Sequence, residues 1–111
     1  GPESGILITE LYDDDNDNMQ IEVDPDLPNQ TLYDDKFVYS LPIDWYGWKT
    51  VVIDLEKFKD ENKNIGDDIW NPSQTLEGSG GLLQMQFVVL SQKEDGDVNF
   101  KIDSIKLFKF R

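Results

Sequence analysis

IDWYGWKTVVIDLEKFK, residues 43–59, is the stretch on which the expected fold depends. It combines two tryptophans, a tyrosine and a glycine with a β-branched run at residues 50–53. β-branched side chains favour a pleated, half-buried surface, because they are stiff and pack well between neighbouring strands. We therefore expect a strand over residues 48–55, followed by no more than two helical turns within residues 56–62.

The aromatic side chains of this stretch admit two interpretations. In a strand, alternate residues from 51 to 55 would point into a core, and Trp48 would have the opposite parity. In the first interpretation, Trp48 is core packing of a strand that is covered on both faces. In the second, Trp45, Tyr46 and Trp48 form a stacking platform for a ligand. The residues of this stretch leave both open.

Other strands are indicated by alternating apolar residues between turn residues. Such segments occupy residues 5–12, 19–23, 37–41, 82–90 and 98–107. A turn at Asp95-Gly96 would precede the last segment, whose apolar parity changes at Asp103-Ser104 and so predicts a bulge or bend there. Short strands separated by turns are typical of an all-β fold, an antiparallel two-sheet β-sandwich.

The 111 residues are enough for one domain with a single two-layer core. We assign residues 5–111 to this domain and interpret residues 1–4, which begin Gly-Pro, as a remnant of tag removal. The formal net charge is −13, from 23 acidic against 10 basic residues. That charge would repel DNA, RNA and anionic lipid surfaces, and no apolar run predicts a membrane-spanning helix.

Cysteine and histidine are both absent. Their absence excludes thiol catalysis, Ser-His-Asp catalysis and the usual zinc ligand sets. A pair of carboxylates suited to glycoside hydrolysis would arise by accident among so many acids, so it carries no signal. We therefore expect no enzymatic activity, and the carboxylates remain available for hard cations.

Two further features could contact a ligand. The loop at residues 63–81 is long for a compact domain and carries Trp70, which would either anchor the loop to the core or face a ligand. On the strand at 82–90, Gln84 and Gln86 share the face opposite the apolar parity. Neutral amides beside aromatic rings suit a sugar, because its C–H face stacks on a ring and its hydroxyls pair with amides. The alternative is an ordinary solvated sheet face.

The acidic segment DDDNDN, residues 13–18, is a candidate calcium-binding loop. Its alternate aspartates have the spacing with which a calcium-binding EF-hand loop begins. The sixth loop position would be Asn18 instead of glycine and the twelfth Asp24 instead of glutamate, so an EF-hand is rejected. A different calcium site that uses some of these carboxylates, or an acidic turn without an ion, would fit the same sequence.

Four motifs carry a resemblance to a known family. They are DWYGWKTVVIDLEKF at 44–58, IWNPS at 69–73, GLLQMQFVVL at 81–90 and FKIDSIKL at 100–107. In order and spacing they resemble the jelly-roll carbohydrate-binding modules, which are galactose-binding-like β-sandwiches, over residues 36–108. The DDDNDN loop after a short strand is similar to that of surface-exposed proteins of gut or marine Bacteroidetes.

The resemblance implies a non-catalytic, glycan-binding accessory module of jelly-roll fold. Such modules are extracellular or cell-surface domains of a larger multidomain protein or of a polysaccharide-utilisation system. By this likeness, Trp45 and Trp70 would stack on the sugar rings of a poly- or oligosaccharide. Tyr46, Gln84 and Gln86 would hydrogen-bond its hydroxyls. Trp48 is the tryptophan of the Gly-Trp-Lys motif, which is often structural in such folds. The resemblance therefore makes Trp48 a weaker candidate for a sugar contact than Trp45, Tyr46 and Trp70.

The resemblance also implies a structural calcium ion. Asp103 matches the aspartate of the last strand that helps to hold this ion in many such modules. Its partner would be an acid near the start of the chain, for which Glu10 or Asp13 could serve.

The alternative function is a structural or protein-interaction domain of a cell-surface assembly. Such a domain would expose strand edges or an apolar patch and would bind no glycan.

Overall fold

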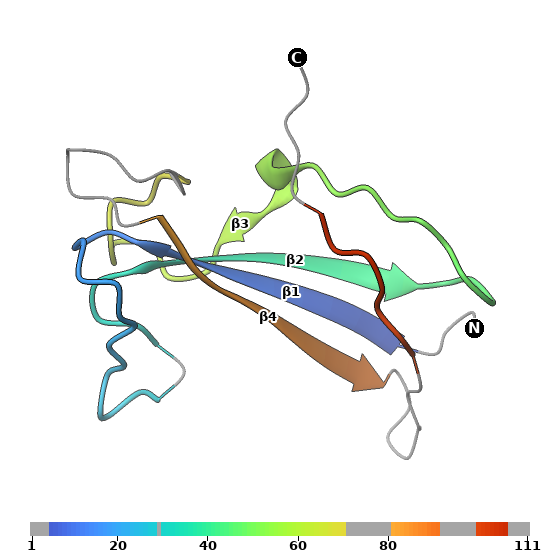
Figure 1. Ribbon diagram of the computed structural model, residues 1–111. Coiled ribbons are helices and arrows are strands. Elements are labelled where there is room, and N and C mark those ends of the chain that lie inside the picture. The colour runs from blue at the N-terminus through green and yellow to red at the C-terminus, as the bar shows by residue number, and fades with distance from the viewer. Residues whose placement is uncertain (1–4, 29, 71–80, 92–99, 107–111) are drawn as a thin grey trace.

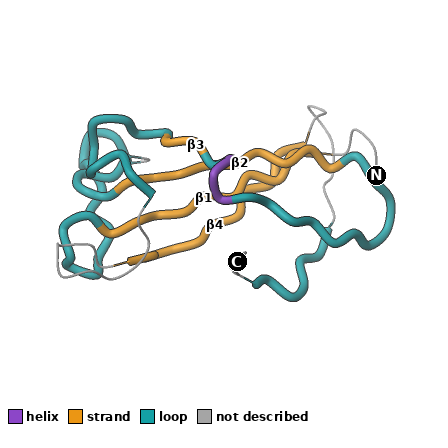
Figure 2. Tube along the Cα trace, turned by 90° about the horizontal axis from the view of Figure 1, so that it is seen from above, coloured by secondary structure: helices purple, strands orange, loops and turns teal. Residues whose placement is uncertain are grey.

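The computed structural model describes residues 5–28, 30–70, 81–91 and 100–106. Within them lies an antiparallel sheet of four strands in the order β3-β2-β1-β4 (Figure 1). The elements are β1, Gly5–Asp14; β2, Asp35–Ile43; the 3-10 helix η1, Leu55–Lys57; β3, Lys59–Asp60; and β4, Gly81–Ser91. Figure 2 shows the long strands side by side, with loops gathered at the end where β1 finishes and β2 begins.

β1 is a central strand, because it pairs with β2 along one edge and with β4 along the other. The register places Leu11 between Phe37 of β2 and Met85 of β4, so apolar residues of three strands share one face. Leu11 is fully buried, and Tyr39 on the same face packs against Phe58 with ring centroids 5.6 Å apart. The core therefore lies on this face of the sheet.

The opposite face of the sheet is polar at the end where β1 finishes; we call this part the polar face. The same register places Tyr12 between Lys36 of β2 and Gln84 of β4, and it places Glu10 beside Gln86. Successive residues of a strand point to opposite faces, so the amides lie away from the core as their parity predicts.

The expected strands at residues 5–12, 37–41 and 82–90 are confirmed as β1, β2 and β4. β1 continues two residues beyond Tyr12, because the pairing with β4 resumes after a register shift at that point. These strands confirm an antiparallel, β-rich chain. The residues that the structure describes form one sheet. A second sheet, which a β-sandwich requires, is not found within them.

The expected strand at residues 48–55 is wrong. Residues 48–54 are irregular and Leu55 begins η1. Asp54 caps this helix by accepting a hydrogen bond from the backbone N–H of Glu56 at 3.0 Å. β-branched residues stabilise a strand only where a neighbouring strand satisfies the backbone and packs on the side chains. None of the described strands pairs with this segment, and Val52 is 63% exposed.

The expected strand at residues 19–23 is also wrong. Met19 has a left-handed backbone, with φ 59°, and its N–H donates a hydrogen bond to the Asp14 carboxylate at 2.9 Å. The chain therefore turns where the apolar alternation begins. An isolated bridge between Val23 and Thr31 is the β-pairing that this segment makes among the described residues.

The closing strand expected at residues 98–107 is absent from its described part, residues 100–106. Ser104 has φ 56° at the point where the apolar parity changes, and a left-handed residue interrupts an extended chain. The turn at Asp95-Gly96 lies outside the described residues. Among the helices described, none has the length and apolar character to cross a membrane.

Candidate metal centre and polar cleft

Four aspartates at one end of the sheet have no exposed surface. Asp13 and Asp14 end β1, Asp34 precedes β2, and Asp35 begins it. An ionised carboxylate is rarely buried completely unless a cation or several donors compensate its charge, because removing it from water is costly. The fold therefore collects carboxylates at a place where water does not compensate their charge.

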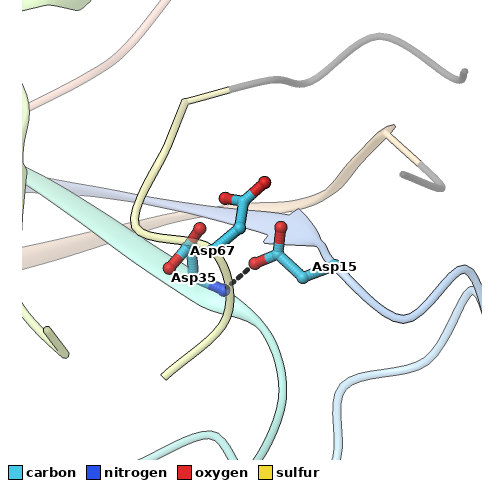
Figure 3. A group of neighbouring side chains, drawn as sticks. All are labelled: Asp15, Asp35 and Asp67. Atoms are coloured by element: carbon cyan, nitrogen blue, oxygen red, sulfur yellow. Dashed lines mark hydrogen bonds between the residues drawn. The ribbon is translucent and has the colours of Figure 1, made fainter. Parts of the chain in front are cut away.

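A first group of three carboxylates comes from three segments of the chain. Asp15 follows β1, Asp35 begins β2, and Asp67 lies in the loop after β3; their side chains gather in Figure 3. One carboxylate oxygen from each lies within 4.8 Å of the others. The backbone N–H of Asp35 donates to Oδ2 of Asp15 at 2.9 Å, which joins the end of β1 to the start of β2.

A second group shares Asp35 and adds Asp60 and Asp68, again with oxygens within 4.8 Å of one another. The backbone N–H of Asp68 donates to Oδ1 of Asp35 at 3.2 Å. Asp60 accepts from the backbone N–H of Asn62 at 2.9 Å, and Asn64 donates its N–H to Asp68. These local turns fold the loop after β3 back onto the aspartates.

Several buried carboxylate oxygens in this region have no hydrogen-bond partner. They are Oδ1 of Asp14 and Asp15, and Oδ2 of Asp34, Asp35 and Asp60. The basic residue nearest in sequence is Lys36, whose Nζ lies 3.3 Å from Oε1 of Glu10 and 3.2 Å from Oε1 of Glu61. Among the described residues, no lysine or arginine forms an ion pair with Asp34 or Asp35.

Several of these buried carboxyls have raised pKa values, which reflects their burial and the excess of negative charge over positive charge around them. Burial, with the neighbouring carboxyls of Asp15 and Asp67, raises the pKa of Asp35 to about 9. Burial raises the pKa of Asp34 to about 6, although the backbone N–H of Asp15 opposes the change. The pKa values of Asp15 and Asp60 are also raised, in each case chiefly by burial. A cation would reverse these shifts, because it favours the charged form.

The cation-free protein is expected to lose stability as the pH rises. The folded pKa of Asp35 lies above the ordinary value of about 3.9, so folding favours its protonated form. That contribution is complete below about pH 4 and disappears towards pH 9. The carboxyls of Asp15 and Asp67 act on the pKa of Asp35 in the same direction as burial, whereas the backbone N–H of Asp68 opposes them.

Melting temperatures of cation-stripped protein, measured from pH 5 to pH 8 at constant ionic strength, should therefore decrease. Asp35→Asn should make the decrease smaller, because it removes the group whose pKa is raised to about 9, and Asp34, with a pKa of about 6, would account for the part that remains. A wild-type melting temperature that rises over this range would contradict the expectation.

The three acidic residues that the family resemblance predicts as calcium ligands lie apart from one another. Asp13 is buried at the end of β1, Glu10 pairs with Lys36 on the polar face, and Asp103 is exposed in the 100–106 segment. None of the three belongs to either aspartate group among the described residues. The sequence signal for the groups is the recurrence of aspartate doublets, at 34–35 and 67–68 beside the 13–15 run.

The polar face carries a cleft of about 570 Å³ between the sheet and the loop at residues 21–31. Gln84 and Gln86 line it together with Glu10, Tyr12 and Lys36. The side-chain amide of Gln84 donates to Oε1 of Gln86 at 3.1 Å, so the two amides hold each other in place. Fixed amide and carboxylate groups around a hollow can hydrogen-bond a hydroxyl-rich ligand.

The aromatic residues of the 44–50 loop lie outside this cleft. Tyr46 is 81% and Trp48 73% exposed. Trp45 is half-buried, with Nζ of Lys49 4.9 Å from its ring centroid. Trp70 is half-buried and packs edge-to-face on Phe37 at 5.3 Å. This contact favours the interpretation of Trp70 as a core anchor, whereas the 44–50 loop presents aromatic surface to solvent.

No family model, curated protein or solved structure matches this chain. The resemblance to carbohydrate-binding modules therefore rests on the sequence motifs alone.

Proposed function

We propose that this chain is a non-catalytic domain that binds a poly- or oligosaccharide and is stabilised by bound calcium. The observation that carries the glycan part is the exposure of Tyr46 and Trp48 on one loop. Two large aromatic side chains exposed on one short loop supply apolar surface of the kind that ligand-binding sites use. An uncharged sugar suits them because its C–H face stacks on a ring and its approach is not opposed by the net charge of −13.

The polar cleft supports the same class of ligand. Gln84 and Gln86 offer donors and acceptors on a rigid strand, and Glu10 adds a carboxylate that accepts hydroxyl protons. The aromatic loop and the cleft would be separate contact regions for an extended glycan. Trp45 lies in the same loop as Tyr46 and Trp48. Its ring would stack on a third sugar if the Lys49 side chain, which covers the ring, moved away.

Removal of an exposed ring is expected to weaken glycan binding. Each stacked ring contributes about 1–2 kcal/mol, so Trp48→Ala or Tyr46→Ala should weaken binding about 5- to 30-fold. The measurement is a calorimetric titration with soluble polysaccharides, chosen from a glycan array run with the wild type. Tyr33→Ala is the matched control, because Tyr33 is exposed but lies in another loop.

Equal affinities for all four proteins would contradict the assignment of the 44–50 loop. No response of the wild type on the array would contradict glycan binding itself. Capture of a protein partner in place of a glycan would favour the alternative, a structural or interaction domain of a cell-surface assembly.

The jelly-roll fold, the extracellular or cell-surface location and the larger polysaccharide-utilisation system are parts of the same proposal. The motifs that resemble carbohydrate-binding modules support them. Val52 and Ile102 lie outside the sheet and are exposed, so they leave apolar surface that a second layer of the sandwich would cover. Hydrogen exchange in which the protected strand amides are only those of the four-stranded sheet would contradict the sandwich.

Calcium is the ion that the aspartate end of the sheet suits best. Every ligand on offer is an oxygen, and the chain has no cysteine or histidine to bind a softer metal. Calcium accepts six to eight oxygens in flexible geometry, whereas magnesium demands a near-ideal octahedron and keeps most of its water. Ions held at Asp15, Asp35 and Asp60 would supply positive charge that neutralises these carboxylates and joins the segments that carry them.

A further inference from the structure

We infer that the aspartate end of the sheet binds two calcium ions, one in each group of three carboxylates, with Asp35 shared between them. This inference rests on the proposed calcium binding and adds the number of ions and the ligands of each. The first ion would be held by Asp15, Asp35 and Asp67, and the second by Asp35, Asp60 and Asp68.

The separation of the oxygens fits calcium in both groups. Calcium–oxygen distances are about 2.3–2.6 Å, so two oxygens on one ion are no more than about 5 Å apart. In each group one oxygen per residue lies within 4.8 Å of the others. Each group also runs from the buried Asp35 through a half-buried aspartate to an exposed one, which leaves a route from solvent to the ion.

Each inner aspartate has one oxygen in use and one available. Asp15 accepts the N–H of Asp35 with Oδ2, and its buried Oδ1 has no partner. Asp35 accepts the N–H of Asp68 with Oδ1, and its buried Oδ2 has none. Asp60 accepts the N–H of Asn62 with Oδ1, and its Oδ2 is likewise left over.

This division is what a metal site requires of its ligands. A backbone donor fixes the orientation of the carboxylate, and the second oxygen remains for the ion. Asp35 has no exposed surface, so its free oxygen cannot be satisfied by bulk water. Because Asp35 is common to both groups and is the most buried member of each, it is the natural bridge.

The charge of the two groups also favours two ions over one. Together they contain five different aspartates. Two divalent ions would balance four of their five negative charges, whereas one ion would leave three unbalanced beside the fully buried Asp35.

The two ions would hold the loop after β3 against the sheet. Asp67 and Asp68 lie in that loop, whereas Asp15 and Asp35 flank the strands. The same loop leads to Trp70, which packs on Phe37 of β2. Calcium would therefore hold the loop against the sheet at Asp67 and Asp68, and the packing of Trp70 on Phe37 holds it at the core.

The test is the number of calcium ions bound by chelator-stripped protein, measured by titration against a chromophoric chelator and checked by equilibrium dialysis. The wild type should bind two ions. Asp15→Asn and Asp60→Asn should each retain one, because each removes a ligand of a single group. Asp35→Asn should weaken both sites by at least tenfold.

Asp103→Asn is the matched control, because Asp103 is an exposed aspartate outside both groups. It should bind two ions with wild-type affinity. The wild-type stoichiometry does not depend on the folding of any variant, and circular dichroism of each variant shows whether it folds.

The number of ions bound distinguishes the two-ion site from the more general proposal that the protein binds calcium. A wild type that binds one ion overturns the shared site but leaves calcium binding intact. A wild type that binds none overturns both. Loss of an ion in Asp103→Asn, with Asp15→Asn and Asp60→Asn unaffected, would also overturn the two groups and place the ion where the family resemblance implies.

Discussion

Saturation with calcium is expected to raise the free energy of unfolding by about 2.7 kcal/mol for each site filled at 100 times its dissociation constant. For a domain of this size, that corresponds to a rise in melting temperature on the order of 10 °C per site. The folded state is expected to bind the ion because it buries Asp35 completely, with a carboxylate oxygen that has no partner. In the unfolded chain the same carboxylates are hydrated and bind calcium weakly, so the ion stabilises the folded state selectively.

The measurement is a thermal melt of stripped protein in calcium, in magnesium and in sodium chloride of matched ionic strength. Sodium chloride controls for screening of the net charge of −13, which would stabilise the fold without a specific site. Asp35→Asn should lose most of the calcium-dependent rise. Equal rises in all three salts would contradict a specific site, because screening alone would then explain them.

The sheet could be predicted from the sequence where alternation and burial agree. β1, β2 and β4 each contain a short run rich in apolar and β-branched residues between turn residues, and their register brings Leu11 against Phe37 and Met85. The 48–55 stretch has an equally strong local pattern, yet it is irregular in the structure. Local β-propensity does not specify which strand satisfies the backbone hydrogen bonds, and that information is tertiary.

The candidate metal centre was predictable only in part for the same reason. The acidic run after the first strand drew attention to calcium, and Asp15 of that run belongs to the first group. Asp35, Asp60 and Asp67 are separated from it by 20 to 52 positions in the printed sequence. They meet it because β2 returns antiparallel to β1 and the loop after β3 folds back over both.

Gly66→Ala is expected to weaken calcium binding at least tenfold, because Gly66 lies directly against the ligands. A Cβ at this position would collide with Oδ2 of Asp15 and lie 2.6 Å from Oδ1 of Asp35. Real Cβ atoms do not approach oxygens so closely, so the carboxylates or the loop must move. Either movement turns the carboxylates, so their other oxygens, Oδ1 of Asp15 and Oδ2 of Asp35, leave the positions from which they would hold the ion. The measurement is the calcium dissociation constant of the stripped variant, with its melting temperature in chelator.

Gly47→Ala separates this collision from backbone strain. Gly47 and Gly66 have nearly the same left-handed backbone, with φ 71° and 74°, so alanine costs about 1 kcal/mol of conformational strain at either position. A Cβ on Gly47 meets nothing within 4 Å, and the residue lies in the aromatic loop away from the aspartates. Gly47→Ala should therefore lower the melting temperature modestly and keep the wild-type calcium affinity. If the two variants bind calcium equally well, Gly66 does not shape the site, and the aspartates around it are not arranged to hold an ion.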